Sequence, residues 1–161
     1  MSGHDPALEA DFRHVLGHFA TGLSVLTADA GAGPVGMTVQ ALMSLSLAPP
    51  LIALGIDRRS RTWPQIRRAG RFCVNLLRVE QEELAWRLGR SDTGKFDGVG
   101  LRAGREGRPE LPEAIAWIGC AVRAEHDGGD HWLVVAEVDE LRLGSGEPLI
   151  FHRGRAGRLM L

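Results

Sequence analysis

The sequence predicts a mainly β fold with flanking helices, in which the strands form a closed barrel. Short runs rich in Val, Ile and Leu alternate with turns rich in Gly and Pro along most of the chain. Runs such as Trp117-Ile118 and Leu133-Val134-Val135 are apolar at neighbouring positions, so both faces of those strands are apolar. Burial on both faces is expected in a barrel with helices outside, or where a strand face is covered in a dimer.

Composition narrows the class of protein. The 161 residues are 44% hydrophobic and 24% charged, with a formal net charge of −1, as expected for one soluble domain spanning residues 1–161. This charge gives no general attraction to nucleic acid or to anionic lipid. Met1–Ala10 lacks the pattern of a secretory signal, and no apolar run reaches the roughly 18 to 20 residues of a membrane helix. We therefore expect a cytoplasmic protein. Cys73 and Cys120, far apart in sequence, are expected to be buried as small hydrophobic residues.

The first element is expected to be a helix. Asp5 can cap it, Pro6 suits its first position, and Thr21-Gly22 ends it. Its apolar residues recur at helical spacing and share one face: Leu8, Phe12, Val15, Leu16 and Phe19.

The later elements follow from strand-like runs and helix boundary signals. Strands are expected at 23–28, 35–41, 50–57, 72–77, 114–125, 130–143 and 148–152. Helices are expected at 63–69, between the cap Thr62 and the stop Gly70, and at 80–88. The polar, Gly-rich segment 91–111 is expected to be a long loop, and loops of that length are often functional.

The segment Gly31–Gly36 matches the pattern G-x-G-x-x-G. That pattern indicates a dinucleotide site only where a helix follows, because the pyrophosphate rests on the helix N-terminus. Here the following residues, 37–41, have the character of a strand, and Pro34 removes an amide donor. We therefore interpret the segment as the turn of a β-hairpin.

Three segments carry residues suited to binding chemistry. The first runs from Gly36 to Pro50, where a strand leads into a loop with Thr38, Ser44 and Ser46. Extended backbone there can pair with the edge of a flat heterocycle, and the hydroxyls can reach a polyol. Spacing alone favours a simpler interpretation, the polar end of a strand.

The second segment is Arg58-Arg59-Ser60-Arg61-Thr62, directly before a predicted helix. Its hydroxyls, guanidinium groups and helix N-terminus suit one phosphate group. The alternative, equally consistent with the sequence, is a capping Thr62 with solvated arginines.

The third segment is His126–His131, whose central Gly-Gly indicates a turn. A flexible turn is poorly organised for metal binding, so no metal site is expected. His131 begins a strand, so its side chain has a fixed direction and can contact a ligand at the barrel rim.

Taken together in order, these and further motifs resemble the short-chain flavin reductases of two-component monooxygenases. The matching stretches are Phe12-Arg13, Phe19–Thr27, Gly36-Met37-Thr38, Ser44–Pro50, Ser60-Arg61-Thr62, Phe72–Leu77, Gln81, Lys95-Phe96, Gly129-Asp130-His131 and Pro148–Phe151. The resemblance runs from about Phe12 to Leu159, and it lies in the order and spacing of the motifs rather than in any one of them.

The resemblance implies an FMN-binding split β-barrel, usually a homodimer, that transfers a hydride from NADH or NADPH to FMN or FAD. A separate oxygenase component would then receive the reduced flavin. By position, Thr38, Gln40 and Ala41 would line the flavin ring, and Ser44 and Ser46 would approach the ring edge and ribityl chain. Ser60 and Thr62 would bind the phosphate, Lys95 and Phe96 would lie beside the flavin, and His131 would correspond to the histidine linked to the nicotinamide.

Two positions depart from the family pattern. Gln40 stands where members often carry Asn, and Ala156 where many carry an aromatic residue. The same barrel also allows an oxidase with tightly bound flavin, as in relatives of pyridoxamine-phosphate oxidase, or a flavin-binding protein without activity. A purely structural domain is a further alternative.

Overall fold

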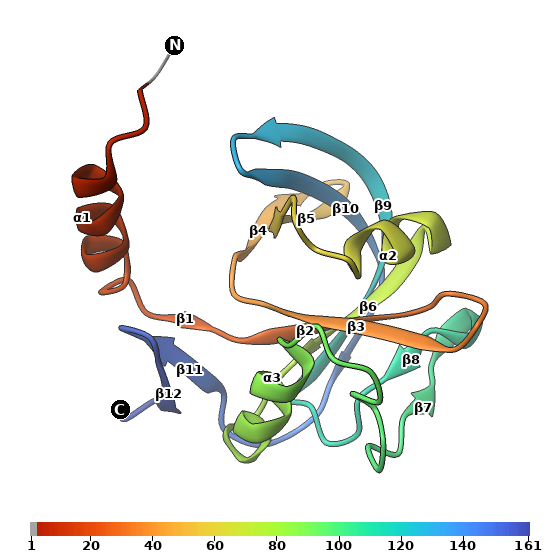
Figure 1. The fold of residues 1–161 in the computed structure, drawn as a ribbon. Helices are drawn as coiled ribbons and strands as arrows, with labels where there is room; N and C mark the ends of the chain where they lie inside the picture. Colours follow the sequence, from red (N-terminus) through yellow and green to blue (C-terminus); the bar gives the residue numbers. More distant parts are fainter. Residues whose placement is uncertain (1–2) are drawn as a thin grey trace.

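The structure, a computed structural model, describes residues 3–161 and is built around one antiparallel sheet of seven strands. Its strands are β2 (Ser24–Asp29), β3 (Pro34–Val39), β4 (Leu42–Leu47), β5 (Pro50–Asp57), β6 (Arg71–Leu76), β9 (Ala116–Gly128) and β10 (His131–Leu143). Their order in the sheet is β3-β2-β6-β9-β10-β5-β4. The long β9–β10 hairpin bends strongly across the molecule (Figure 1).

Smaller elements surround this sheet (Figure 1). The helices are α1 (Pro6–Leu16), α2 (Trp63–Ala69) and α3 (Glu82–Leu88), with single 3₁₀ turns at Val79–Gln81 and Arg105–Gly107. One small sheet joins β1 (Thr21–Gly22), β11 (Leu149–His152) and β12 (Arg155–Arg158), and another joins β7 (Arg102–Ala103) and β8 (Pro109–Glu110).

The seven-stranded sheet has to roll up because of one short connection. β3 and β4 lie at opposite edges of the strand order, yet only Gln40 and Ala41 separate them in sequence. At this corner the amide of Gly55 donates to the carbonyl of Ala41 at 3.0 Å. A Cβ atom on Gly55 would lie 3.0 Å from the Cβ of Ala41, so the close approach depends on the glycine. The expected mainly β barrel with flanking helices is confirmed.

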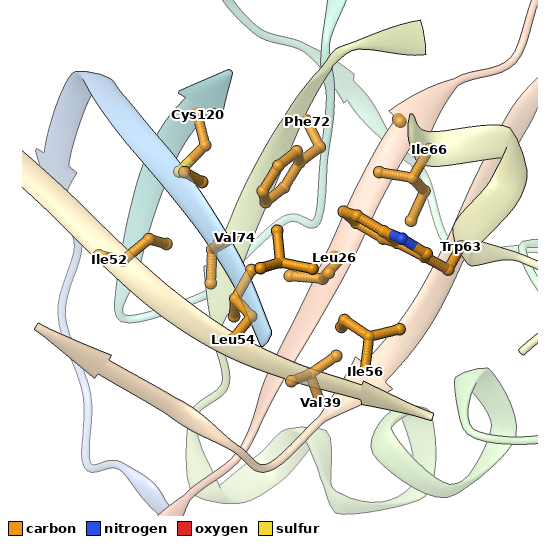
Figure 2. Packing of buried hydrophobic residues seen from close by; sticks show 13 residues of the cluster. Leu26, Val39, Ile52, Leu54, Ile56, Trp63, Ile66, Phe72, Val74 and Cys120 are labelled. Carbon is orange, nitrogen blue, oxygen red and sulfur yellow. The ribbon is translucent and has the colours of Figure 1, made fainter. Parts of the chain in front are cut away.

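The core fills both sides of the strands near β2. Figure 2 shows Leu26, Leu54 and Phe72 packed inside the barrel with Trp63 of α2, whose ring centroid lies 6.2 Å from that of Phe72. A second cluster lies under α3, on the other face of β2, and includes Leu23, Val25, Leu77, Leu88 and Leu149. At β2, the neighbouring apolar residues Val25 and Leu26 are therefore buried on opposite faces by two clusters within one chain. On β10 the prediction of burial on both faces is wrong for Leu133, which is 44% exposed. Cys73 and Cys120 are free and buried, as expected.

Several boundaries differ from the sequence-based prediction. Residues 42–47, expected to be a loop, form strand β4, because their backbone pairs with β5 in an edge hairpin. The first helix ends at Leu16, and Thr21-Gly22 form β1 instead of its end. The loop 91–111 contains β7, a 3₁₀ turn and β8, and the strand β12 was not expected. Residues 63–69 are helical as predicted, and Gly70 ends that helix with φ of 76°.

Helix α1 stands away from the barrel, and none of its residues is buried (Figure 1). Its cap is as predicted, since Asp5 Oδ1 accepts from the amides of Ala7 at 3.0 Å and Leu8 at 3.3 Å. The apolar residues predicted to share one face are all exposed: Leu8, Phe12, Val15, Leu16 and Phe19. No helix of the described residues is long and apolar enough to cross a membrane.

Candidate functional site

Three adjoining hollows of about 460, 420 and 410 Å³ form one groove on the surface of the described residues. Thr38, Gly89 and Arg90 line both the first and the second hollow. The second and third share four lining residues: Arg61, Thr62, Ser91 and Lys95. The groove therefore runs along β3, between α3 and the residues that precede α2.

One end of the groove is broad and partly aromatic. Trp86 of α3 and Phe151 of β11 line it, with ring centroids 6.1 Å apart and nearly edge to face. Thr38 and Gln40 line the same end, and the Thr38 hydroxyl donates to the carbonyl of Ala85 at 2.6 Å. This bond fixes β3 against α3 and leaves lone pairs of the Thr38 oxygen as acceptors.

The other residues predicted near a ring lie differently. Ala41 adjoins Gln40 at the barrel corner, where its carbonyl is used by Gly55. Ser44 and Ser46 lie on β4, where Ser44 pairs with Ile52 and Ser46 with Leu51, and neither lines the three hollows. The structure does not bring these two serines to the groove, because the expected loop is a strand.

The opposite end of the groove carries hydroxyl and cationic groups. Arg61, Thr62 and Lys95 line both the middle hollow and the end hollow, and Ser60 lines the middle one. The cap of α2 differs from the prediction: the Ser60 hydroxyl accepts from the amide of Trp63 at 3.0 Å, and the Thr62 side chain makes no capping bond. Pro64, in the first turn, has no amide proton. Any anion bound here would therefore depend mainly on side chains rather than on the tip of α2.

Two of the three arginines in the segment Arg58–Thr62, Arg58 and Arg59, have side-chain partners of their own. Arg58 pairs with Asp127, donates to the carbonyl of Gly129 at 2.7 Å, and lies 3.8 Å from the ring centroid of Trp132. It thereby fixes the tip of the β9–β10 hairpin.

Arg59 pairs with Asp57 at 2.8 Å, and its hydrogen bonds hold the pKa of that carboxyl well below its usual range. Arg61 lines two hollows, and within residues 3–161 its guanidinium forms no hydrogen bond or ion pair. Of the three cations, Arg61 is therefore the one free to meet an anion in the groove.

His131 lies at the rim beside the groove. It is the first residue of β10 and pairs in register with Asp57, which lines the middle hollow. Its Nδ1 atom is 2.7 Å from Asp130 Oδ1, and its side chain is 45% exposed. The backbone bond from Arg58 to the carbonyl of Asp130, at 3.0 Å, holds the adjoining turn. His131 thus has a fixed backbone and a side chain open to solvent.

Residues 16–160 match the family model described as flavin reductase like domain. The chain belongs to this family. It is 40% identical over 145 residues to the reductase subunit of a flavin-dependent monooxygenase from Rhodococcus jostii, covering 89% of this chain and 74% of that protein. It is also 40% identical to the reductase component of a 4-hydroxyphenylacetate 3-monooxygenase from Thermus thermophilus, covering 89% and 92%.

Solved structures of the family agree with the fold of this flavin reductase-like chain. Component B of a nitrilotriacetate monooxygenase from Mycobacterium thermoresistibile superposes with a TM-score of 0.92 at 36% identity, covering 96% of this chain and 88% of that one. An NADH:FAD oxidoreductase from Streptomyces globisporus, in complex with NAD and FAD fragments, gives 0.90 at 30% identity, covering 99% and 98%. The family resemblance and the split-barrel fold predicted from the sequence are confirmed.

The groove of this flavin reductase-like chain includes residues to which the sequence analysis assigned no binding role. Trp86, Gly89, Arg90 and Phe151 come from α3, the residues after it, and β11. No motif or spacing in the sequence joins these segments. Ala156, one of the two departures from the family pattern, pairs with Phe151 across β11 and β12. A small residue there lies opposite an aromatic wall of the groove.

We predict that Ser60 contributes to stability and that Thr62 does not. Ser60→Ala removes the capping acceptor of α2 and should lower the free energy of unfolding by about 1 kcal/mol. Thr62→Ala removes no capping bond and should change it by less than about 0.5 kcal/mol. Urea denaturation of the two variants checks this. Equal destabilisation by both substitutions would contradict the assignment of the cap to Ser60.

Proposed function

We propose that this chain is an NAD(P)H-dependent flavin reductase that reduces FMN or FAD and supplies the product to a separate monooxygenase component. One observation carries the proposal: in a chain of this family, a single groove joins a partly aromatic end to an end with a free guanidinium and hydroxyls. A flavin nucleotide has a matching arrangement, with a flat ring at one end and a phosphate at the other.

The residues present fit such a nucleotide. Thr38 and Gln40, with Trp86 and Phe151, are suited to the ring, since they offer polar edge groups beside aromatic surfaces. Arg61 and Thr62, with no internal side-chain partner among the described residues, are suited to the phosphate. Lys95 and Phe96 border this end, and Ser60 supports it from the cap of α2.

The groove would bring a flavin, the hydride acceptor, next to the nicotinamide, and this transfer would need no nucleophile from the protein. The residues of this chain have to bind and orient the two nucleotides. Thr38, fixed by Ala85, would hold the ring edge, and the positive charges of Arg61 and Lys95 would favour the anionic tail. His131, at the rim next to Asp57, would contact the nicotinamide nucleotide as it approaches from solvent.

The names of the relatives support the proposed oxygenase partner and the proposed flavin and nicotinamide nucleotides. Proteins similar to this chain are named as reductase components of monooxygenases, as an FMN reductase (NADH) and as an NADH:FAD oxidoreductase. These names support a nicotinamide-dependent reductase that works with an oxygenase. Both flavins and both nicotinamide nucleotides therefore belong in the assay.

We predict that the purified chain oxidises NADH or NADPH only when FMN or FAD is present. The decrease in nicotinamide absorbance measures this for all four pairs. No turnover with any pair would contradict the reductase. Flavin fluorescence quenched without nicotinamide oxidation would indicate a flavin-binding protein without this activity. Flavin retained through dialysis, again without nicotinamide oxidation, would indicate an oxidase.

We predict that His131→Ala raises the KM for the nicotinamide nucleotide by about tenfold, the loss of one good contact. The Kd for flavin should stay within about twofold, because His131 lies outside the three hollows that form the groove. Steady-state kinetics and flavin fluorescence give the two values. His126→Ala, on the same hairpin and also exposed, is the matched control. Equal loss of both affinities would show that His131 supports the structure instead.

A homodimer is part of the proposal. Helix α1 presents an apolar face, with Phe12 and Val15 each more than 60% exposed, and none of its residues is buried among the described residues of the chain. An 11-residue helix gains little stability alone in water, so a second copy covering this face would stabilise it.

Light scattering should therefore give a dimer, and Phe12→Asp should shift it to monomer. Ala10→Asp, two residues away on the opposite face of α1, should leave the dimer intact. A monomeric unmodified chain, or a Phe12→Asp variant that stays dimeric, would contradict this interface.

A further inference from the structure

The loop of residues 91–97 forms one wall of the phosphate end of the groove. All seven of its residues line the hollow of about 410 Å³, opposite Arg61, Thr62 and Gln65. The loop contains no helix or strand, so contacts with neighbouring elements have to hold it in place. The width of the groove at this end depends on where those contacts seat the loop.

One of these contacts is between Phe96 and Gly36. Gly36 is buried in β3, and a Cβ atom built on it would lie 2.6 Å from Phe96 Cζ. Carbon atoms at optimal separation are about 3.5 to 4.0 Å apart, so the ring occupies the space of a side chain at position 36. Phe96 also packs against the cluster under α3. The absent side chain of Gly36 therefore lets the loop rest directly on β3.

Lys95 also holds the loop against β3, through hydrogen bonds. β3 is at an edge of the sheet, so carbonyls on its outer side have no strand partner. Lys95 Nζ donates to the carbonyl of Gly36 at 3.4 Å and to that of Leu88, the last residue of α3, at 3.3 Å. A cation is also favourable beside the C-terminus of a helix. Arg87 adds a bond to the carbonyl of Asp97 at 3.4 Å.

We propose that Gly36 is a positioning residue for flavin binding, acting through Phe96 and Lys95, which seat the loop 91–97 against β3. This inference rests on the proposed function. It gives Lys95 and Phe96 a role in shaping the wall of the groove, beyond any direct contact with the nucleotide. It also gives a reason for the last glycine of the Gly31–Gly36 segment, which is a packing site rather than part of a dinucleotide motif.

The test compares Gly36→Ala, Phe96→Ala and the double variant. Each single substitution should raise the Kd for flavin about tenfold or more, as an unseated wall misplaces the phosphate contacts. For Gly36→Ala the loss should appear as a higher KM for flavin rather than as a lower kcat at saturating flavin, since the ring end is untouched. Gly157→Ala is the matched control, because its added Cβ meets nothing within 4 Å.

The double variant separates a positioning role from a general loss of structure. A Cβ on Gly36 would also lie 2.9 Å from the carbonyl oxygen of Leu26, so Gly36→Ala alone can destabilise the β2–β3 pair. If Gly36 acts through Phe96, the double variant should bind flavin about as well as Phe96→Ala alone. Fully additive losses would overturn the proposal.

A readout without flavin completes the experiment. Limited trypsin digestion should cut after Arg90 and Lys95 faster in Gly36→Ala and Phe96→Ala than in the unmodified chain. A loop that no longer packs against β3 is more accessible to the protease. Unchanged cleavage, or unchanged flavin affinity in both single variants, would overturn the inference alone. An unmodified chain that binds no flavin would instead overturn the proposed function, and this inference with it.

Discussion

The two-residue connection between β3 and β4 is the constraint on which the rest of the structure depends. It joins strands at opposite edges of a seven-stranded sheet. The sheet therefore has to roll until its two edge strands, β3 and β4, come close enough for two residues to connect them. The hydrogen bond between Gly55 and Ala41 closes this corner, and the absence of a side chain on Gly55 allows the approach. Gln40, the other residue of the connection, is thereby carried to the mouth of the groove.

The rolled sheet leaves one edge of β3 without a strand partner, and the groove is built on that edge. α3 is bonded to it through Thr38 and Ala85, and the loop 91–97 through Gly36 and Lys95. The edge that would otherwise invite pairing with another strand is thus covered by a helix and a loop. Binding surface and edge protection are provided by the same contacts, which links the affinity of the groove to the integrity of the fold.

Ion pairing, rather than the overall composition, decides which arginine near the groove can bind an anion. With a net charge of −1, the chain has no overall field to attract nucleotides. Arg58 is occupied by the hairpin tip and Arg59 by Asp57, which leaves Arg61 facing two of the hollows. A local cation with no internal partner can attract a phosphate even in a nearly neutral protein. The neighbouring pairs fix the backbone from which Arg61 projects.

Local patterns in the sequence determined several helices, strands and turns of this protein. The helix at 63–69 and the hairpin turn between β2 and β3 follow from the spacing of apolar residues and from Gly and Pro at the boundaries, which act over a few residues. The order of motifs was enough to identify the family. Tertiary structure alone decided which hydroxyl caps α2, which arginine stays free, and which aromatic residues face the groove. It also turned 42–47 into a strand, moving Ser44 and Ser46 away from the groove lining. These outcomes depend on contacts between segments far apart in the chain, such as Phe151 with Trp86 and Phe96 with Gly36, for which no local pattern exists.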